Sequence, residues 1–392
     1  NRSRFSNTGK VTATRFGDQA GANNFLARHP PQIFTYMTIS PISLGPLSAA
    51  ATSPRGSSVS FILGTWCCAL LSWLPAGCQS TANRPTTTTR VQPHLGTLVF
   101  ITIQDHNNAA VQRAINAAFD EFRAVDKLLS IHRADSELAV LNKAAAKGPI
   151  VASAELFATL QTAQAFSRQT EGAFDPTIRP LADLWGFVKK EGYRLPTMAE
   201  LATVLPRVGW QKVRLDDTHH TVRFTAPGIS IDPGGFGKGL AVDHAIKRLE
   251  ALGVKNAMVK AGGDLRVIGL PPGRDHWLIF IEDPKKHGKR TAIHFREGAL
   301  STSGNYENFF MANDRRYSHL LDPRTGLPVQ EVASCTVTAP TCVQSDALAT
   351  ACFILGPKKS MALFGNKLGI RFILEKKGKL VHRTSRGFPA LP

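Results

Sequence analysis

A glycine-rich segment between two apolar stretches could bind phosphate groups. It reads Asp232-Pro-Gly-Gly-Phe-Gly-Lys238-Gly239, follows the apolar Ile229-Ser-Ile and leads into a helical pattern from Leu240. Glycines ahead of a helix let backbone N–H groups approach a phosphate closely, and the helix dipole and Lys238 both favour negative charge there. The segment is neither a Walker A loop nor a G-x-G-x-x-G fingerprint. It predicts a pyrophosphate site; the alternative is a glycine-rich turn without a ligand.

A carboxylate and a hydroxyl, those of Asp346 and Thr350, lie four residues apart near the C-terminus. This spacing places both on one face of a helix. Their oxygens are hard ligands of the kind that Mg²⁺ prefers, and waters and substrate phosphates usually complete its shell. The pair predicts a magnesium site. The alternative is an acid near a helix start followed by an ordinary threonine.

His319 could accept a proton, because an imidazole has an unperturbed pKa close to neutral. It stands in Tyr317-Ser-His-Leu-Leu, directly before the turn sequence Asp-Pro-Arg-Thr-Gly. We therefore expect it near a strand end, where side chains can meet a cleft. A histidine flanked by apolar residues is more often structural than catalytic, so both roles stay open at this point.

An apolar and aromatic stretch could line a pocket for a ring. It contains Ala173, Phe174 and Asp175 and leads through Pro-Thr into Leu184-Trp-Gly-Phe187. Ordinary core packing would give the same composition. The stretch alone does not decide between the two.

The order of these motifs resembles that of the ApbE family of FAD:protein FMN transferases, over nearly all of residues 95–356. The motifs are AFDPT, DPGGFGKG, GGD, STSGNYENF, YSHLLDPRTG and DALATA. The segments around His94-Leu-Gly-Thr97 and from His132 also resemble the family. Two residues depart from its pattern: the family often has methionine where Leu95 stands and tyrosine, which packs on the flavin, where His132 stands. The resemblance places Leu95 and His132 at the flavin and leaves its stacking partner open.

The resemblance also implies where FAD binds. Its pyrophosphate would lie over the glycine loop, held by Asp232, Lys238 and a backbone contact near Leu320. Residues 173–175 would line the flavin nucleotide pocket. The implied ligands of Mg²⁺ are Asp346, Thr350 and the backbone oxygen around Gly235.

The activity that the resemblance implies is phosphoryl transfer. A Ser or Thr hydroxyl of an acceptor flavoprotein attacks the FMN-side phosphorus of FAD, and AMP leaves. Such reactions depend on positioning and on neutralising charge, here by Mg²⁺ and Lys238. His319 is the expected base, since the family places a functionally important histidine there.

Two other functions fit the same motifs. An FAD pyrophosphatase would use water in place of the acceptor hydroxyl and release FMN and AMP. A non-catalytic flavin-binding lipoprotein would store or present FAD, although metal ligands beside a phosphate loop have little purpose in storage. Nucleic-acid binding would rest only on the net charge of +18. The basic residues are scattered, without an RNA-binding signature, so we expect no nucleic-acid partner.

Periodicity predicts one α+β catalytic domain of mainly antiparallel strands with inserted helices, rather than a regular βαβ winding. The expected helices cover residues 107–129, 154–168, 239–252 and 345–355. The expected strands cover residues 96–103, 221–224, 257–260, 277–281 and 335–338.

The first 77 residues are read as a leader. Residues 59–74 form an uncharged apolar run, too short for a confident membrane span but typical of a secretory signal. The run ends at Pro75-Ala-Gly-Cys78, which resembles a bacterial lipobox and predicts a lipid on Cys78. The alternative is a buried apolar helix. The first methionine is Met37; translation can start near it, in which case the residues before it are not native.

The expected organisation is a leader over 1–77, a Thr- and Pro-rich tether over 78–93 and an FAD-binding transferase domain over 94–392. The lipid would hold the protein at the periplasmic face of a bacterial membrane, with the inner membrane favoured. Cys335, Cys342 and Cys352 of the domain have no metal-binding spacing and are expected in the core, although one pair could form a disulfide.

Overall fold

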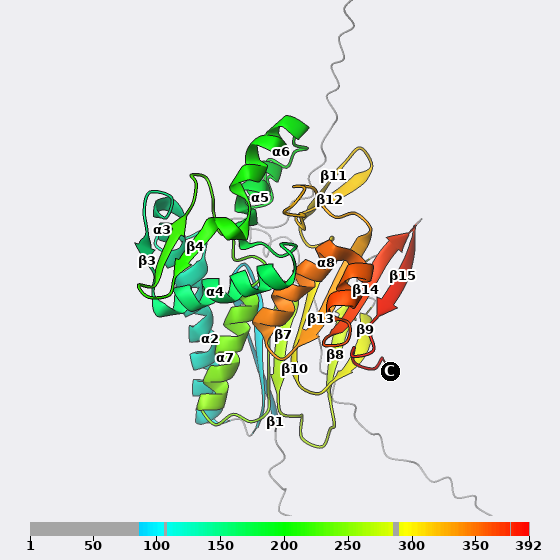
Figure 1. Cartoon of the computed structure of the whole chain (residues 1–392). Helices are drawn as coiled ribbons and strands as arrows, with labels where there is room; N and C mark the ends of the chain where they lie inside the picture. Colours follow the sequence, from blue (N-terminus) through cyan, green and yellow to red (C-terminus); the bar gives the residue numbers. More distant parts are fainter. Residues whose placement is uncertain (1–85, 106–107, 285–289, 377, 392) are drawn as a thin grey trace, which may run out of the picture.

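The chain is an α+β protein, as predicted, built on an eight-stranded sheet (Figure 1). The computed structural model describes residues 86–105, 108–284, 290–376 and 378–391. Neighbouring strands of the sheet are all antiparallel. In spatial order the strands are β1 (Thr86–His94), β2 (Thr97–Asp105), β6 (Ala257–Ala261), β7 (Asp264–Ile268), β10 (Gly298–Gly304), β13 (Val332–Ala339), β14 (Gly369–Lys376) and β15 (Lys379–Thr384). The predicted leader, Cys78 and residues 78–85 of the tether lie outside the described residues.

Three long helices cover one face of the sheet: α2 (Ala109–Leu129), α7 (Gly237–Ala251) and α8 (Cys342–Phe364) (Figure 1). Side chains alternate between the faces of a strand. Val259 of β6 therefore packs with α2 and α7, whereas its neighbour Met258 packs on the other face, against the hairpin of β8 (Trp277–Glu282) and β9 (Arg290–Phe295). The core thus has two layers, separated by the sheet.

Smaller elements flank this core. The first group contains α3 (Glu137–Ala144), β3 (Ile150–Val151), α4 (Ala154–Gln169), β4 (Val213–Asp216) and β5 (Thr221–Phe224). The second group contains α5 (Arg179–Trp185), α6 (Met198–Val204) and the hairpin of β11 (Phe309–Ala312) and β12 (Arg315–Ser318). An aromatic cluster that includes Trp185, Phe187 and Phe310 joins the members of the second group.

The expected helices and strands are present, most of them within a few residues of their predicted ends. The exception is the helix expected over 345–355, because α8 continues to Phe364. Residues 86–93 correct the prediction, because they form most of β1 instead of a tether. β1 pairs with β2 along its whole length, from Thr86 opposite Asp105 to His94 opposite Thr97. Threonine is β-branched and favours strands, and the proline at 93 is tolerated because β1 is an edge strand.

Helix α8 supplies much of the remaining core. It contains a break at Gly356, which has φ 73°, and Pro357 follows. Among the described helices it alone is long and apolar enough to cross a membrane. Leu348 and Phe353 of this helix are, however, buried against the sheet. The three domain cysteines are free and buried, as expected for core residues.

Helices α7 and α8 meet at Gly239. A Cβ atom there would lie 2.4 Å from the Cys342 carbonyl oxygen and 2.8 Å from the Cα atom of Val343. Alanine has a higher helix propensity than glycine, by about 1 kcal/mol, but contact with backbone atoms cannot be relieved by turning a side chain. Only glycine allows this approach.

We therefore expect Gly239→Ala to lower the free energy of unfolding by about 1–3 kcal/mol, the usual cost of overpacking. Thermal unfolding followed by circular dichroism measures this. Gly148→Ala is the matched control, because a Cβ at Gly148 would meet no atom within 4 Å. Equal stability of the two variants would contradict the close packing.

Candidate functional site

The site residues gather at one end of the sheet, where several turns meet. The turn between β1 and β2 contains Leu95, and the turn between β6 and β7 contains Gly262 and Gly263. The Gly262 N–H donates to the Leu98 carbonyl over 3.3 Å, and the Thr302 N–H donates to the Gly263 carbonyl over 3.1 Å. The turns before β2 and β7 and the end of β10 therefore lie together, beside the first turn of α7.

The glycine loop connects Ile231 to α7 and is shaped by Asp232. Its Oδ1 accepts a hydrogen bond from the Gly234 N–H over 2.8 Å, and its own N–H donates to the Pro176 carbonyl over 2.7 Å. Burial raises the pKa of the Asp232 carboxyl, although the Gly234 N–H acts in the opposite direction. Asp232 thus forms the turn that directs the loop into α7.

Lys238, on the first turn of α7, lies between two buried carboxylates. Its Nζ is 3.1 Å from Asp264 Oδ2 and 3.8 Å from Asp346 Oδ2, and the Lys238 side chain is 30% exposed. The two carboxylates outweigh the burial of the amine and raise the pKa of Lys238, so it stays charged. With both carboxyls ionised, the three groups carry one excess negative charge. Buried charge of this kind is costly unless a cation compensates it.

Asp264 is a site residue to which the sequence analysis gave no role. It is the Asp of the GGD motif and is 3% exposed. The motif was visible, but its order along the chain does not reveal a partner 26 residues earlier. Only the pairing of β6 with β7, which brings the turn beside α7, shows the contact with Lys238.

Asp346 connects α8 to the first turn of α7. Its Oδ2 accepts a hydrogen bond from the Gly239 N–H over 3.0 Å. Burial, with Asp264 next, raises the pKa of Asp346 to about 7, against the effect of Lys238. Its other oxygen, Oδ1, accepts no hydrogen bond from the described part of the chain. This oxygen remains available to a ligand.

Thr350 lies one turn after Asp346 on α8, as predicted. Its Oγ1 is 3.3 Å from Ser303 Oγ at the end of β10. A Cβ built on Gly235 would lie 3.4 Å from the same Oγ1, so the glycine loop passes directly beside it. The three predicted metal ligands, Asp346, Thr350 and the backbone at Gly235, therefore lie in the same part of the structure.

These donors fit Mg²⁺ better than a softer metal. Within the described residues, no three His, Cys, Asp or Glu side chains come together in a group that could hold a metal. A carboxylate, a hydroxyl and a backbone oxygen supply only hard oxygen ligands, which leave room for waters and phosphates. Asp346 and Thr350 would hold the ion, and Gly235 could add its carbonyl.

His319 follows β12, and a hydrogen bond fixes the orientation of its ring. Its Nδ1 lies 3.1 Å from the Asn308 carbonyl oxygen. A carbonyl only accepts, so Nδ1 carries the hydrogen and Nε2 keeps a lone pair. Burial lowers the pKa of His319 to about 4, helped by the charge of Lys238. The pKa of His319 therefore lies below the unperturbed value of an imidazole.

Asn308 is a second residue whose role the sequence did not reveal. Its side-chain oxygen accepts from the Tyr193 hydroxyl over 3.0 Å, and its Nδ2 donates to the Phe187 carbonyl over 3.2 Å. The Phe187 ring also packs edge-on against His319, with centroids 6.5 Å apart. Asn308 lies in the STSGNYENF motif, which gave the only signal. Asn308 therefore connects Phe187, which follows α5, to His319 through hydrogen bonds.

Ala173, Phe174 and Asp175 are all buried. Phe174 packs edge-on against Phe236 of the glycine loop, so this stretch does lie beside the loop. The Asp175 carboxylate is already occupied: Oδ1 accepts from the N–H and Oγ1 of Thr177, over 2.8 and 2.6 Å, and Oδ2 accepts from the Trp210 N–H. The Asp175 carboxylate therefore holds the backbone at Thr177 and Trp210 in place.

The remaining predicted contacts lie at the rim of the site or below it. His132 is exposed. Leu95 adopts a positive φ of 49° in its turn and packs partly against the core. Leu320 is 5% exposed, and its carbonyl accepts from the Val329 N–H over 3.1 Å. Their contact with a flavin nucleotide stays a prediction.

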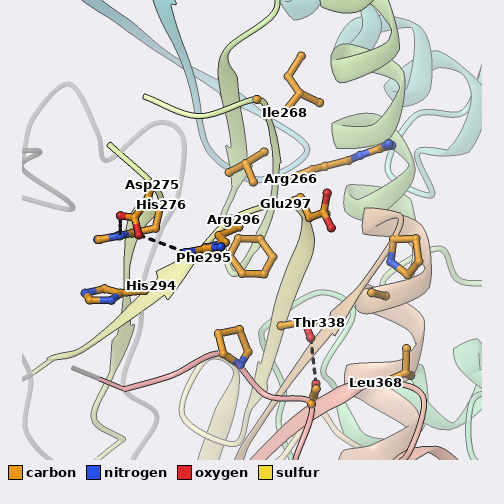
Figure 2. A pocket seen from close by; sticks show the side chains of 18 of the residues that line it. Arg266, Ile268, Asp275, His276, His294, Phe295, Arg296, Glu297, Thr338 and Leu368 are labelled. Carbon is orange, nitrogen blue, oxygen red and sulfur yellow. Dashed lines mark hydrogen bonds and ion pairs between the residues drawn. The ribbon is translucent and has the colours of Figure 1, made fainter. Parts of the chain in front are cut away.

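The large groove of Figure 2, about 1310 Å³, lies elsewhere. It is lined by the far ends of the same strands, including Ile268 of β7 and Thr338 of β13, together with His276 and His294. None of the predicted site residues lines it. The predicted site residues lie instead at the other end of the sheet, around the first turn of α7.

Comparison with known proteins agrees with this architecture. Residues 95–374 match the ApbE family. The FAD:protein FMN transferase of Treponema pallidum is 33% identical over 72% of this chain and 82% of its own length. The enzyme of the same name from Haemophilus influenzae is 34% identical over 68% of this chain and 80% of its own length.

Solved structures agree as well. The ApbE protein of Thermotoga maritima is 31% identical, with a TM-score of 0.72 over 77% of this chain and 97% of that one. The flavin transferase ApbE of Vibrio cholerae is 28% identical, with a TM-score of 0.71 over 78% of this chain and 98% of that one. The family match covers well over half of the chain and includes every predicted site residue of the domain. The chain belongs to the ApbE family.

Proposed function

We propose that the protein transfers FMN from FAD to a Ser or Thr hydroxyl of an acceptor flavoprotein and releases AMP. The observation that carries this proposal is the position of Lys238 and Asp346. Lys238 belongs to the first turn of α7, and Asp346 of α8 accepts a hydrogen bond from that turn, directly behind a glycine loop whose backbone can approach a pyrophosphate. The names of the relatives from Treponema pallidum and Haemophilus influenzae support the same activity.

In the proposed reaction the acceptor oxygen forms a bond to the FMN-side phosphorus, and the bond from that phosphorus to the bridging oxygen breaks. AMP leaves with the bridging oxygen. The hydroxyl proton passes to Nε2 of His319, whose Nδ1 hydrogen is fixed by Asn308. Lys238 and the positive end of the α7 dipole stabilise the charge that develops on the phosphate oxygens.

Magnesium, held by Asp346 and Thr350, would neutralise phosphate charge when bound. The two carboxyls around Lys238 support this part of the proposal, since with both ionised they leave one excess negative charge that a divalent cation would offset. The available Oδ1 of Asp346 offers the ion a ligand oxygen.

Product analysis separates this function from FAD hydrolysis and from simple storage. The purified chain from residue 78 is incubated with FAD and Mg²⁺, with and without envelope proteins of the source organism. Chromatography measures AMP and free FMN, and in-gel fluorescence detects flavin that resists denaturation. We expect AMP together with a fluorescent acceptor band. AMP with equal free FMN would identify a pyrophosphatase, and bound but intact FAD would identify a storage protein.

We further propose that a lipid on Cys78 anchors the protein at the periplasmic face of the membrane, the inner one being favoured. We expect mass spectrometry of the native N-terminus to find a diacylated or triacylated Cys78. Cys78→Ser should move the protein from the membrane to the soluble fraction. An unmodified N-terminus at another residue would contradict the anchor, though not export.

A further inference from the structure

The first turn of α8 is capped by a residue of another helix. Its own N-cap residue, Thr341, makes no side-chain capping bond. Asp243 of α7 takes this role: its Oδ1 accepts from the Cys342 N–H and its Oδ2 from the Val343 N–H, both over 2.9 Å. Asp243 is 4% exposed. The free N–H groups at the start of a buried helix need such partners.

The capping is reciprocal. The N-cap residue of α7, Phe236, also makes no side-chain capping bond, and the Gly239 N–H donates to Asp346 of α8. Gly239 and Asp243 are four residues apart, so they share one face of α7. Each helix therefore supplies a carboxylate to the first turn of the other, across the close contact at Gly239.

Asp243 is held in turn by Arg266 of β7. Arg266 Nη1 lies 2.6 Å from Asp243 Oδ1, and the Arg266 side chain is 18% exposed. In Figure 2 this side chain extends from the groove toward the helices. The Asp243 charge is thus compensated without any contribution from the site, and both of its oxygens are engaged by α8 or Arg266.

We propose that Asp243 is a positioning residue for the metal ligand Asp346; this inference rests on the proposed function. Asp243 fixes the start of α8 against α7. Asp346 lies one turn further along α8, and its Oδ2 is bound to the Gly239 N–H. With the helix register and one oxygen fixed, the orientation of Oδ1, the oxygen that would bind the ion, is fixed as well. Groups that orient a metal ligand without touching the metal typically account for about 10–100-fold in metal affinity.

The test measures binding of Mn²⁺, as a spectroscopic substitute for Mg²⁺, by electron paramagnetic resonance with FAD present. Asp243→Asn removes one of the two capping acceptors. We expect it to weaken Mn²⁺ binding about tenfold or more. Arg266→Met is the matched control: it breaks the same ion pair but leaves both capping acceptors, so Mn²⁺ affinity should stay within about twofold of wild type.

A second variant separates positioning from helix stability. Thr341→Asp, added to Asp243→Asn, gives α8 a carboxylate at its own N-cap but no link to α7. We expect the melting temperature to recover while Mn²⁺ affinity stays low. Recovery of both, or an unchanged affinity in Asp243→Asn, would overturn the inference.

Failure of the proposed metal site would look different, because wild type itself would then bind no Mn²⁺ with FAD. If Asp243→Asn does not fold alone, the comparison is made between the double variant and Thr341→Asp. An equal Mn²⁺ affinity of these two would again overturn the inference.

Discussion

Replacing His319 by alanine should slow FMN transfer by about 10²–10⁴-fold while FAD still binds. The imidazole is the proposed proton acceptor, with Nδ1 hydrogen-bonded to the Asn308 carbonyl and Nε2 carrying the lone pair. The glycine loop, Lys238 and Asp346 do not depend on its ring. FAD affinity is measured by flavin fluorescence and transfer by in-gel fluorescence.

The control for this variant is His294→Ala, which removes an exposed histidine of the distant groove (Figure 2). It should leave both quantities unchanged. Loss of FAD affinity together with transfer would make His319 a binding or structural residue. Undiminished transfer in His319→Ala would remove it from the mechanism.

The pH dependence of transfer also tests whether His319 accepts the proton. Burial lowers the pKa of His319 to about 4. The ring is therefore neutral, and able to accept a proton, well below pH 6. The contribution of His319 should keep the rate up until the pH falls towards about 4. Because the unfolded chain binds a proton at this position near pH 6.5, the residue also makes the fold less stable as the pH falls from about 6.5 to 4.

Asp346→Asn should abolish metal-dependent transfer and leave the protein folded. Asparagine keeps an oxygen that can accept from the Gly239 N–H but loses the charge that a divalent ion requires. Truncation to alanine would also leave that buried N–H without its acceptor, so Asn is the cleaner variant. Transfer is measured against Mg²⁺ concentration.

The metal-free stability of Asp346→Asn gives an independent prediction. The pKa of Asp346 is raised to about 7, so folding favours its protonated form. Stability conferred by protonation is lost as the pH rises through about 7, and Asn imitates the protonated carboxyl at every pH. We therefore expect Asp346→Asn to melt no earlier than wild type at pH 8. Asp135→Asn, which alters an exposed carboxylate, is the matched control. Normal turnover by Asp346→Asn would contradict the metal assignment.

Local sequence predicted the elements that carry the site, since periodicity and β-branched runs report them directly. The strand at 221–224 and the helix from Ala109 are examples. The edge strand β1 was misread because its Thr- and Pro-rich sequence is also typical of a tether. Its partner β2, rather than its composition, decides that Thr86–His94 is a strand.

Spacing also predicted that Asp346 and Thr350 share one face of a helix, and both lie on α8. It could not predict the roles of Asp243 and Asp264. Their partners are distant in the sequence, and only the packing of α7 against α8 and β7 brings them together. The lowered pKa of His319 is likewise a property of the folded chain, because burial causes it.

Peptide mapping of the acceptor by mass spectrometry tests the central proposal most directly. The envelope proteins are incubated with FAD, Mg²⁺ and either wild type or His319→Ala. The flavin-labelled acceptor is then digested and sequenced by fragmentation. We expect wild type to add one FMN, through a phosphate ester, to a Ser or Thr side chain, and the variant to add far less in the same time. An unmodified acceptor in a wild-type reaction that has consumed FAD would contradict the proposed transfer.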